Sequence, residues 1–254
     1  MRLALGVDDV HVRYRFTDGV SEEELAEARR TLSSEECARA DRFVFARDRL
    51  TFVSAHALLR RALSLYEDVP AGAWAFAQNE FGKPRLADRH RGIDIGFNLA
   101  HTHGLVACVV CRGTDVGIDV ESMNPRIHSL DLATRYFSPT EVSGLQACAE
   151  HDRAARFIEL WTLKEAYVKA IGTGLSHPLD TFSFVLHGSS SLRFEPPIGD
   201  QRPVWQFALF APSELHRMAV AIGGGANERR RITTWGGDIA GSASPIRRTA
   251  VHDA

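Results

Sequence analysis

The sequence lacks several features that would assign a protein to a class at once. It has no apolar run near the roughly 20 residues that a membrane-spanning helix needs. Asp8 and Asp9 follow the start of the chain too soon for a secretory signal peptide. Four cysteines are too few for a disulfide-built scaffold, and a net charge of −2 gives no support for binding to nucleic acid or to a membrane surface. These absences predict a cytoplasmic globular protein.

Common catalytic motifs are also missing. The sequence has no serine in a nucleophile elbow and no phosphate-binding loop of the G-x-x-x-x-G-K-[ST] type. His101 and His103 have no histidine or cysteine partner at zinc spacing, which argues against a zinc site. Cys108 and Cys111 fall within an apolar strand, where their side chains would point to opposite faces of the sheet. We therefore interpret these two cysteines as core residues rather than as a redox pair.

Lysine is scarce. Of the 30 basic residues only three are lysines, Lys83, Lys164 and Lys169. Arginine replaces lysine easily where only a positive charge is needed, but not where a compact ammonium group is required. Two of the three lysines lie in one predicted helix. The positions of these three lysines make them candidates for a specific role. The alternative is that they remained lysines by chance.

The chain divides into two segments with a similar order of elements. In residues 1–113, helical patterns at 21–32, from 33 onward and at 47–65 precede extended patterns at 93–99 and 105–111. In residues 114–222, a strand at 116–121 precedes helices that begin at 138 and 152, and three further strands follow. We predict an α/β (α+β) protein built from two halves. Residues 223–254 lack periodicity and predict a flexible tail.

The stretch from Val116 to Glu121 predicts a strand with an acidic face. Alternation places its three β-branched side chains on one face, and Asp119 and Glu121 with Gly117 on the other. Carboxylate oxygens are the ligands that hard divalent cations such as Mg²⁺ prefer. A solvated outer face of a sheet would show the same pair, so both interpretations stay open at this point.

The helix predicted from 157 to 171 carries a second set of candidates. Trp161, Glu165 and Lys169 are spaced i, i+4 and i+8, which places them along one stripe. In the functional interpretation, Glu165 supplies a third carboxylate and Lys169 contacts a phosphate group. In the alternative, the two residues form an ordinary i, i+4 ion pair worth about 0.3–0.5 kcal/mol.

Four segments together resemble the larger, Sfp-type (surfactin-activating) class of 4′-phosphopantetheinyl transferases. The order and spacing of the motifs carry the resemblance, which covers about residues 21 to 222. The motifs are Phe81–Pro84, Phe97–Thr102, Val116–Glu121 and Trp161–Lys169. The stretch from Arg39 to Asp48 is also similar. In one departure, Ala100 precedes His101 where the family usually has serine.

The resemblance implies a fold, a reaction and a partner. The fold would be two similar α/β halves related by a pseudo-two-fold axis within a monomer, with coenzyme A bound between them. The reaction would transfer 4′-phosphopantetheine from coenzyme A to a serine of an acyl or peptidyl carrier protein and release 3′,5′-ADP. This is the activity of a holo-[acyl-carrier-protein] synthase, in fatty acid, polyketide or nonribosomal peptide synthesis. The attacking serine would belong to the partner, which accounts for the missing nucleophile.

The resemblance also implies roles for individual residues. Asp119, Glu121 and Glu165 would bind Mg²⁺ or Mn²⁺, and Glu165 would also accept the proton of the attacking serine. Lys169 would stabilise charge on the pyrophosphate as the bond breaks.

Three further residues would bind coenzyme A. By the same resemblance, Lys83 and His101 would contact its phosphates, and Arg39 would contact the 3′-phosphate. All three lysines of the chain lie within the family motifs.

Two other functions remain open from the sequence. An Mg²⁺-dependent nucleotide pyrophosphatase could use the same carboxylates and lysine with water as the nucleophile. A non-catalytic module that binds carrier proteins could keep the fold, although such a module would be expected to lose the acidic ligands.

Overall fold

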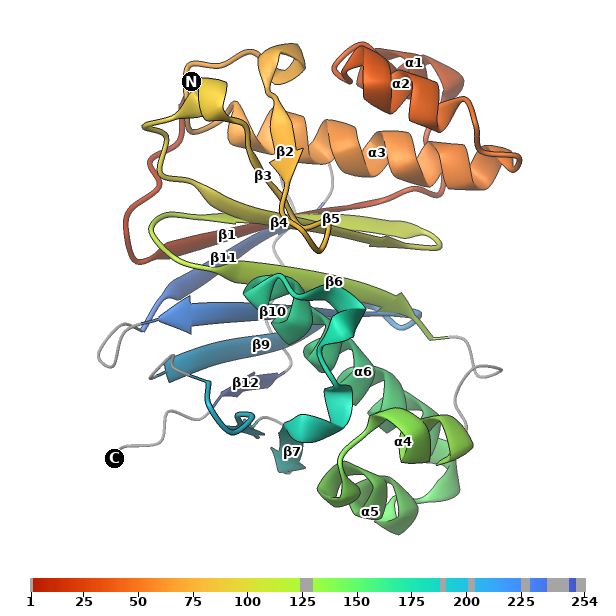
Figure 1. Cartoon of the computed structure of the whole chain (residues 1–254). Helices are drawn as coiled ribbons and strands as arrows, with labels where there is room; N and C mark the ends of the chain where they lie inside the picture. Colours follow the sequence, from red (N-terminus) through yellow and green to blue (C-terminus); the bar gives the residue numbers. More distant parts are fainter. Residues whose placement is uncertain are drawn as a thin grey trace.

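A computed structural model describes residues 2–123, 130–187, 191–200, 204–224, 229–236 and 247–249. Two β-sheets pack face to face, and helices cover the outer face of each sheet (Figure 1). This arrangement confirms the prediction of two α/β halves. Among the described helices, none is both long and apolar enough to cross a bilayer.

The first half is a four-stranded sheet covered by α3. Its elements are β1 (Asp9–Phe16), α1 (Glu22–Arg29), α2 (Ser34–Ala40), α3 (Ala46–Leu63), β2 (Phe76–Gln78), β3 (Pro84–Leu86), β4 (Gly96–Thr102) and β5 (Leu105–Cys111). The strand order is β11-β1-β5-β4, where β11 is Arg231–Gly236, and β2 and β3 form a separate small hairpin. Short 3₁₀ turns lie at Ala71–Ala73 and Asp88–His90.

The second half is a six-stranded sheet covered by α6. Its elements are β6 (Val116–Ser122), α4 (Leu130–Tyr136), α5 (Pro139–Ala147), α6 (Glu150–Ile171), β7 (Ser183–His187), β8 (Ser191–Glu195), β9 (Val204–Ser213), β10 (His216–Gly224) and β12 (Arg247–Thr249). The strand order is β6-β10-β9-β12-β8-β7. Two further 3₁₀ turns, Gly174–Ser176 and Leu179–Thr181, follow α6.

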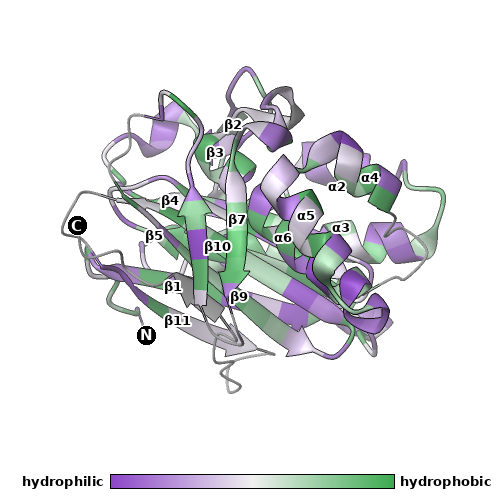
Figure 2. Cartoon of the chain, turned by 90° about the horizontal axis from the view of Figure 1, so that it is seen from below, coloured by the Kyte–Doolittle hydropathy of each residue, from purple (hydrophilic) through white to green (hydrophobic). Residues whose placement is uncertain are grey.

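The core between the sheets explains the alternation seen in the sequence. Inward-facing side chains of β1, β4 and β5 meet those of β6, β9 and β10 in one buried cluster. In Figure 2, hydrophobic residues are concentrated along the strands, and hydrophilic ones are more frequent on the outer helices and loops. Cys108 faces α3 while Cys111 faces the other sheet, so these two thiols do point to opposite faces. Asn98 on β4 joins the halves directly, because its Oδ1 accepts the backbone N–H of Ile118 on β6 at 3.1 Å.

Part of the segment predicted to be a flexible tail is ordered. Gly223 and Gly224 complete β10, and Arg231–Gly236 forms β11, which runs parallel to β1 in the first half. The Arg231 guanidinium lies 2.6 Å from Asp9, and Ile232 packs against the core between the sheets. The prediction was wrong for these residues because this short strand gains its stability from pairing with a strand more than 200 residues away, which local periodicity does not reveal. Arg247–Thr249 of the predicted tail forms β12. Residues 225–228, 237–246 and 250–254 of the predicted tail lie outside the described residues.

Candidate functional site

A close approach between β6 and α6 brings the acidic strand against the lysine-bearing helix. A Cβ atom at Gly117 would overlap two backbone groups of α6, so only glycine lets the strand lie this near. Asp119 on β6 thereby reaches Lys169 on α6, with 2.5 Å between Oδ1 and Nζ. The Asp119 side chain is 6% exposed and that of Lys169 is 30% exposed.

The electrostatics of this pair favour a charged lysine. Burial by itself would lower the pKa of Lys169, but the carboxylates of Asp119, Glu165 and Glu121 outweigh burial and raise it. The same surroundings disfavour ionised glutamates. Burial, followed by the charge of Asp119, raises the pKa of Glu121 to about 7, and burial and Asp119 also raise the pKa of Glu165. Lys169 opposes both increases.

The donor set fits a hard divalent cation. Asp119 Oδ2 and Glu165 Oε1 are buried and have no hydrogen-bond partner among the described residues. A buried carboxylate oxygen without a partner is costly unless a cation or a donor satisfies it. In the described part of the chain, no three acidic, histidine or cysteine side chains are near enough to hold one ion as they stand. Binding through Asp119, Glu121 and Glu165 together therefore requires these side chains to rearrange.

His101 on β4 is within electrostatic range of Lys169 and of two other basic side chains. Burial, followed by the charges of Lys169, His56 and Arg39, lowers the pKa of His101. Residues from α2, α3, β4 and α6 therefore act on one another electrostatically at this point. Arg39 and Lys169, both selected from the sequence, and His56, which was not, therefore all influence His101 electrostatically.

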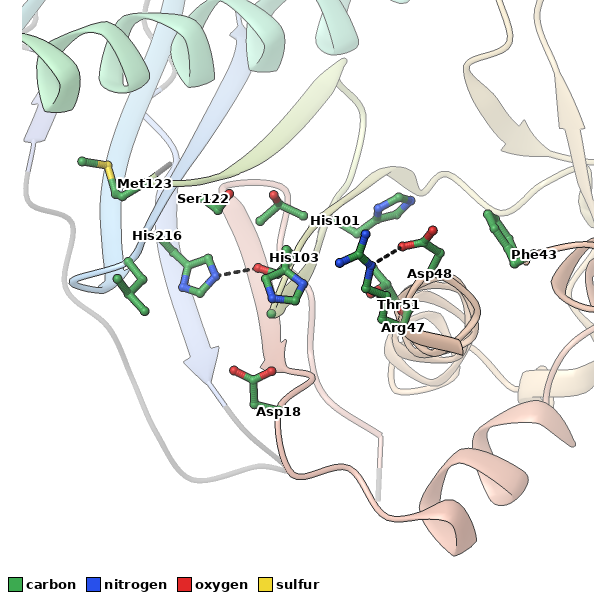
Figure 3. Close-up of a pocket in the computed structure, with 13 residues that line it drawn as sticks. Asp18, Phe43, Arg47, Asp48, Thr51, His101, His103, Ser122, Met123 and His216 are labelled. Carbon is green, nitrogen blue, oxygen red and sulfur yellow. Dashed lines mark hydrogen bonds and ion pairs between the residues drawn. The ribbon is translucent and has the colours of Figure 1, made fainter. Parts of the chain in front are cut away.

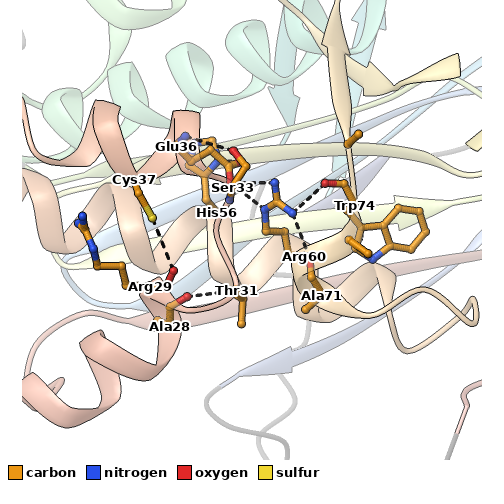
Figure 4. Close-up of polar contacts among 12 residues, drawn as sticks. Ala28, Arg29, Thr31, Ser33, Glu36, Cys37, His56, Arg60, Ala71 and Trp74 are labelled. Atoms are coloured by element: carbon orange, nitrogen blue, oxygen red, sulfur yellow. Dashed lines mark hydrogen bonds and ion pairs between the residues drawn. The ribbon is translucent and has the colours of Figure 1, made fainter. Parts of the chain in front are cut away.

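His56 is a candidate that sequence reasoning missed. Its Nδ1 lies 2.9 Å from Oε1 of Glu36, and its ring packs against Phe52 in a tilted arrangement with 4.1 Å between centroids. Glu36 also pairs with the buried Arg60 at 2.8 Å, and Figure 4 shows Glu36 between His56 and Arg60. The Arg39 guanidinium covers the same Phe52 ring at 5.2 Å. One signal in the sequence could have found His56, namely that it lies on the helix that follows the similar stretch 39–48.

A cavity of about 730 Å³ opens between the two halves beside His101. Figure 3 shows Ser122, Met123 and His216 on one side, Arg47, Asp48 and Phe43 on the other, and His101 and His103 between them. Ser122 directly follows Glu121 on β6, so the acidic strand ends at the edge of this cavity.

Lys83 and Lys164 make contacts that the sequence did not predict. The Lys83 ammonium donates to the carbonyl of Ala170 at 2.6 Å, so it ties the turn before β3 to the C-terminal end of α6. Asn79 supports this junction by donating to the Gly172 carbonyl at 2.8 Å. Lys164 is fully buried against Glu141 at 2.8 Å, away from the acidic strand. Lys83 is not among the residues that line the cavity between the halves.

Carboxylates and a lysine on a facing strand and helix, beside further cations, are typical of enzymes that transfer phosphoryl groups. Comparison with models of known protein families gives a more specific assignment. Residues 115–222 match the model of the 4′-phosphopantetheinyl transferase superfamily, and residues 20–112 match the model of a 4′-phosphopantetheinyl transferase N-terminal region. The chain belongs to the 4′-phosphopantetheinyl transferase superfamily, a family of enzymes.

Two sequence relatives agree with this assignment. The chain is 34% identical over 222 residues to the 4′-phosphopantetheinyl transferase HetI of Nostoc sp., covering 87% of this chain and 91% of that protein. It is 33% identical over 178 residues to the 4′-phosphopantetheinyl transferase Sfp of Bacillus subtilis, covering 70% and 77% of the two chains. A holo-(acyl-carrier-protein) synthase from Bacillus anthracis, solved in complex with coenzyme A, covers 45% of this chain and all of its own, with 17% identity and a TM-score of 0.38.

Proposed function

We propose that this protein transfers 4′-phosphopantetheine from coenzyme A to a serine of an acyl or peptidyl carrier protein, with Mg²⁺ or Mn²⁺, and releases 3′,5′-ADP. The observation that carries the proposal is the contact between Asp119 and Lys169, with buried and unpartnered carboxylate oxygens on Asp119 and Glu165 beside it. These residues lie in the segment that matches the superfamily model.

Glu165 is suited to accept the proton of the attacking serine hydroxyl. Because its pKa is raised, by burial first and by Asp119 second, its carboxylate is a stronger base than an exposed glutamate. As that proton leaves, the serine oxygen forms a bond to the β-phosphorus of coenzyme A. The bond from this phosphorus to the bridging oxygen breaks, and 3′,5′-ADP leaves with that oxygen.

During bond breaking, the bridging oxygen of coenzyme A would become a second partner of Lys169 besides Asp119. Its ammonium group stays charged and can donate to the bridging oxygen as negative charge accumulates there. Asp119, Glu121 and Glu165 would hold the divalent cation, which when bound neutralises the charge of the pyrophosphate.

The side chains around Phe52 are suited to hold the 3′-phosphate. Arg39 and His56 both lie over this ring, and His101 is within their electrostatic reach. We propose that all three contact the 3′-phosphate, with Glu36 fixing the orientation of His56. Lys83 would approach coenzyme A from the junction at the end of α6.

The test is the intact mass of purified apo-carrier proteins after incubation with this protein, coenzyme A and Mg²⁺. We expect a mass increase of one phosphopantetheine group, none when a chelator removes the metal, and nearly none with Asp119→Asn. Release of 3′,5′-ADP without any carrier would instead indicate a pyrophosphatase. Carrier binding with no mass change would indicate a non-catalytic module.

A further inference from the structure

Large apolar side chains are exposed on both sides of the cavity mouth. Val44 and Phe45 are 89% and 59% exposed in the connection between α2 and α3, and Leu215 is 67% exposed in the turn between β9 and β10. Their neighbours Phe43 and Arg47 line the cavity from one half, and Leu215 itself lines it from the other. Figure 3 shows Phe43 and Arg47 of the first side across His101 and His103 from His216, which follows Leu215 in the chain.

Phe45 occupies the N-cap position of α3, where a small polar residue would stabilise the helix more. Ser21, Ser33 and Ser138 form capping boxes at the starts of α1, α2 and α5. Phe45 is the N-cap of α3 and makes no side-chain hydrogen bond to that helix. Serine, threonine or aspartate at an N-cap stabilises a helix, whereas a large apolar residue does not. Phe45 therefore does not cap the helix, and more than half of its surface remains exposed in the isolated protein.

The same rim is basic. Residues 39–49 contain four arginines and two aspartates, in a chain whose net charge is −2. Both aspartates have partners, because Asp41 lies 2.7 Å from Arg29 and Asp48 lies 3.5 Å from Arg47, which leaves the other arginines in excess. Arg47 lies over the Phe45 ring at 5.4 Å, so a cation and an exposed aromatic ring share one surface. A partner that fits this rim presents apolar side chains together with acidic ones.

We propose that this rim, defined as Val44, Phe45, Arg47 and Leu215, is the docking surface for the carrier protein. Val44 and Phe45 from one half and Leu215 from the other are the apolar anchors, and acidic side chains beside the reactive serine face Arg47. Because the anchors belong to different halves, a docked domain straddles the cavity and brings its serine toward the end of β6, where the acidic strand reaches the cavity edge. The inference rests on the proposed transferase function, since it is the transfer that requires a protein substrate at the cavity mouth.

The test is steady-state transfer with the carrier concentration varied at saturating coenzyme A and Mg²⁺. The variants are Val44→Ser with Phe45→Ser together, and Leu215→Ser alone. The matched controls are Val7→Ser and Ile198→Ser, which remove apolar side chains that are 68% and 107% exposed and are not among the residues that line the cavity. We expect the KM for the carrier to rise about tenfold in the rim variants and to stay unchanged in the controls. The kcat and the Kd for coenzyme A, measured by calorimetry, stay at the wild-type values.

Two further measurements separate docking from a structural role. Phe45→Ser alone keeps or raises the melting temperature, because serine can cap α3, while it still raises the KM. Added salt raises the KM of the wild-type protein more than that of Arg47→Gln, because it screens the attraction to the acidic partner.

Several outcomes would overturn the proposal that the rim is the docking surface for the carrier protein. An unchanged KM in both rim variants would do so while leaving the transferase function in place. A weaker Kd for coenzyme A in Leu215→Ser would place that residue in the coenzyme site instead. A concentration-dependent dimer that the rim variants abolish would make the rim an interface between two copies of this chain. Failure of the wild-type protein to modify any carrier would contradict the proposed function itself and is recognised before any variant is made.

Discussion

The ammonium group of Lys164 lies 2.8 Å from Oε2 of Glu141, and neither side chain has any exposed surface. Lys164 also donates to the carbonyls of Leu179 and Phe182 at 2.6 and 2.8 Å. Glu141 accepts the backbone N–H of Phe184 at 2.8 Å. This one ion pair therefore connects α5 and α6 with β7 and with the chain that leads into it. Lys164 directly precedes Glu165 in α6.

Lys164→Met should destabilise the protein strongly. Removing one partner of a buried ion pair leaves the other charge buried without compensation, which typically costs about 3–5 kcal/mol. The double variant Lys164→Met with Glu141→Gln should lose less than the sum of the two single variants, because neither charge is then left alone. Urea unfolding of the four proteins measures the coupling. Strictly additive losses would show that the two residues act independently.

Lys169→Arg should impair turnover and not folding. Lys169 is partly exposed and contacts Asp119 at 2.5 Å, so a larger, planar guanidinium would displace the carboxylate or miss the reacting phosphate. The interaction is expected to strengthen as charge builds on the leaving oxygen, so the defect should be mainly in kcat. Steady-state transfer with coenzyme A varied measures it. A variant with the kcat of the wild-type protein would leave Lys169 as a simple ion-pair partner.

Gly117→Ala should disrupt the site through the backbone. A Cβ at this position would overlap α6, so the strand and the helix must separate, which moves Asp119 away from Lys169. We expect lower stability and greatly reduced transfer. Gly144→Ala is the matched control, because Gly144 lies in α5 and a Cβ there meets nothing within 4 Å. That control should keep full activity and gain up to about 1 kcal/mol of helix stability.

Glu36 should make folding stability depend on acid pH. Burial alone would raise its pKa, but hydrogen bonds from His56 and the Ser33 backbone, with the charge of Arg60, lower it from 4.5 to about 2. A lowered pKa stabilises the folded state above the unfolded value of 4.5, and this contribution is lost as pH falls from 4.5 through 2. The contribution is about 3 kcal/mol at neutral pH.

Urea unfolding of the wild type and Glu36→Gln at pH 7 and pH 3 tests this dependence. The stability difference between the two proteins should shrink by roughly half at pH 3. A difference that is the same at both pH values would mean that Glu36 is not held as a charged partner of His56 and Arg60.

The sequence by itself determined two things about this protein: which acidic and basic side chains share a face of one strand or one helix, and which family the chain belongs to. Period-2 alternation placed Asp119 and Glu121 on one face of β6, and helical spacing placed Glu165 and Lys169 on one stripe of α6. These are properties of a single element, which neighbouring residues decide. The order of the motifs then led to the 4′-phosphopantetheinyl transferases, which the family comparison confirmed.

Only the tertiary structure decided which residues from distant elements meet. His56 joins Arg39 and His101, Lys83 caps the end of α6, and β11 pairs with β1. The three lysines also separate into different roles, since Lys164 is buried with Glu141 while Lys169 contacts Asp119 at the acidic strand. Each of these contacts joins residues that are far apart in the chain. Periodicity describes one helix or strand at a time, whereas such contacts depend on how the sheets and helices pack against one another.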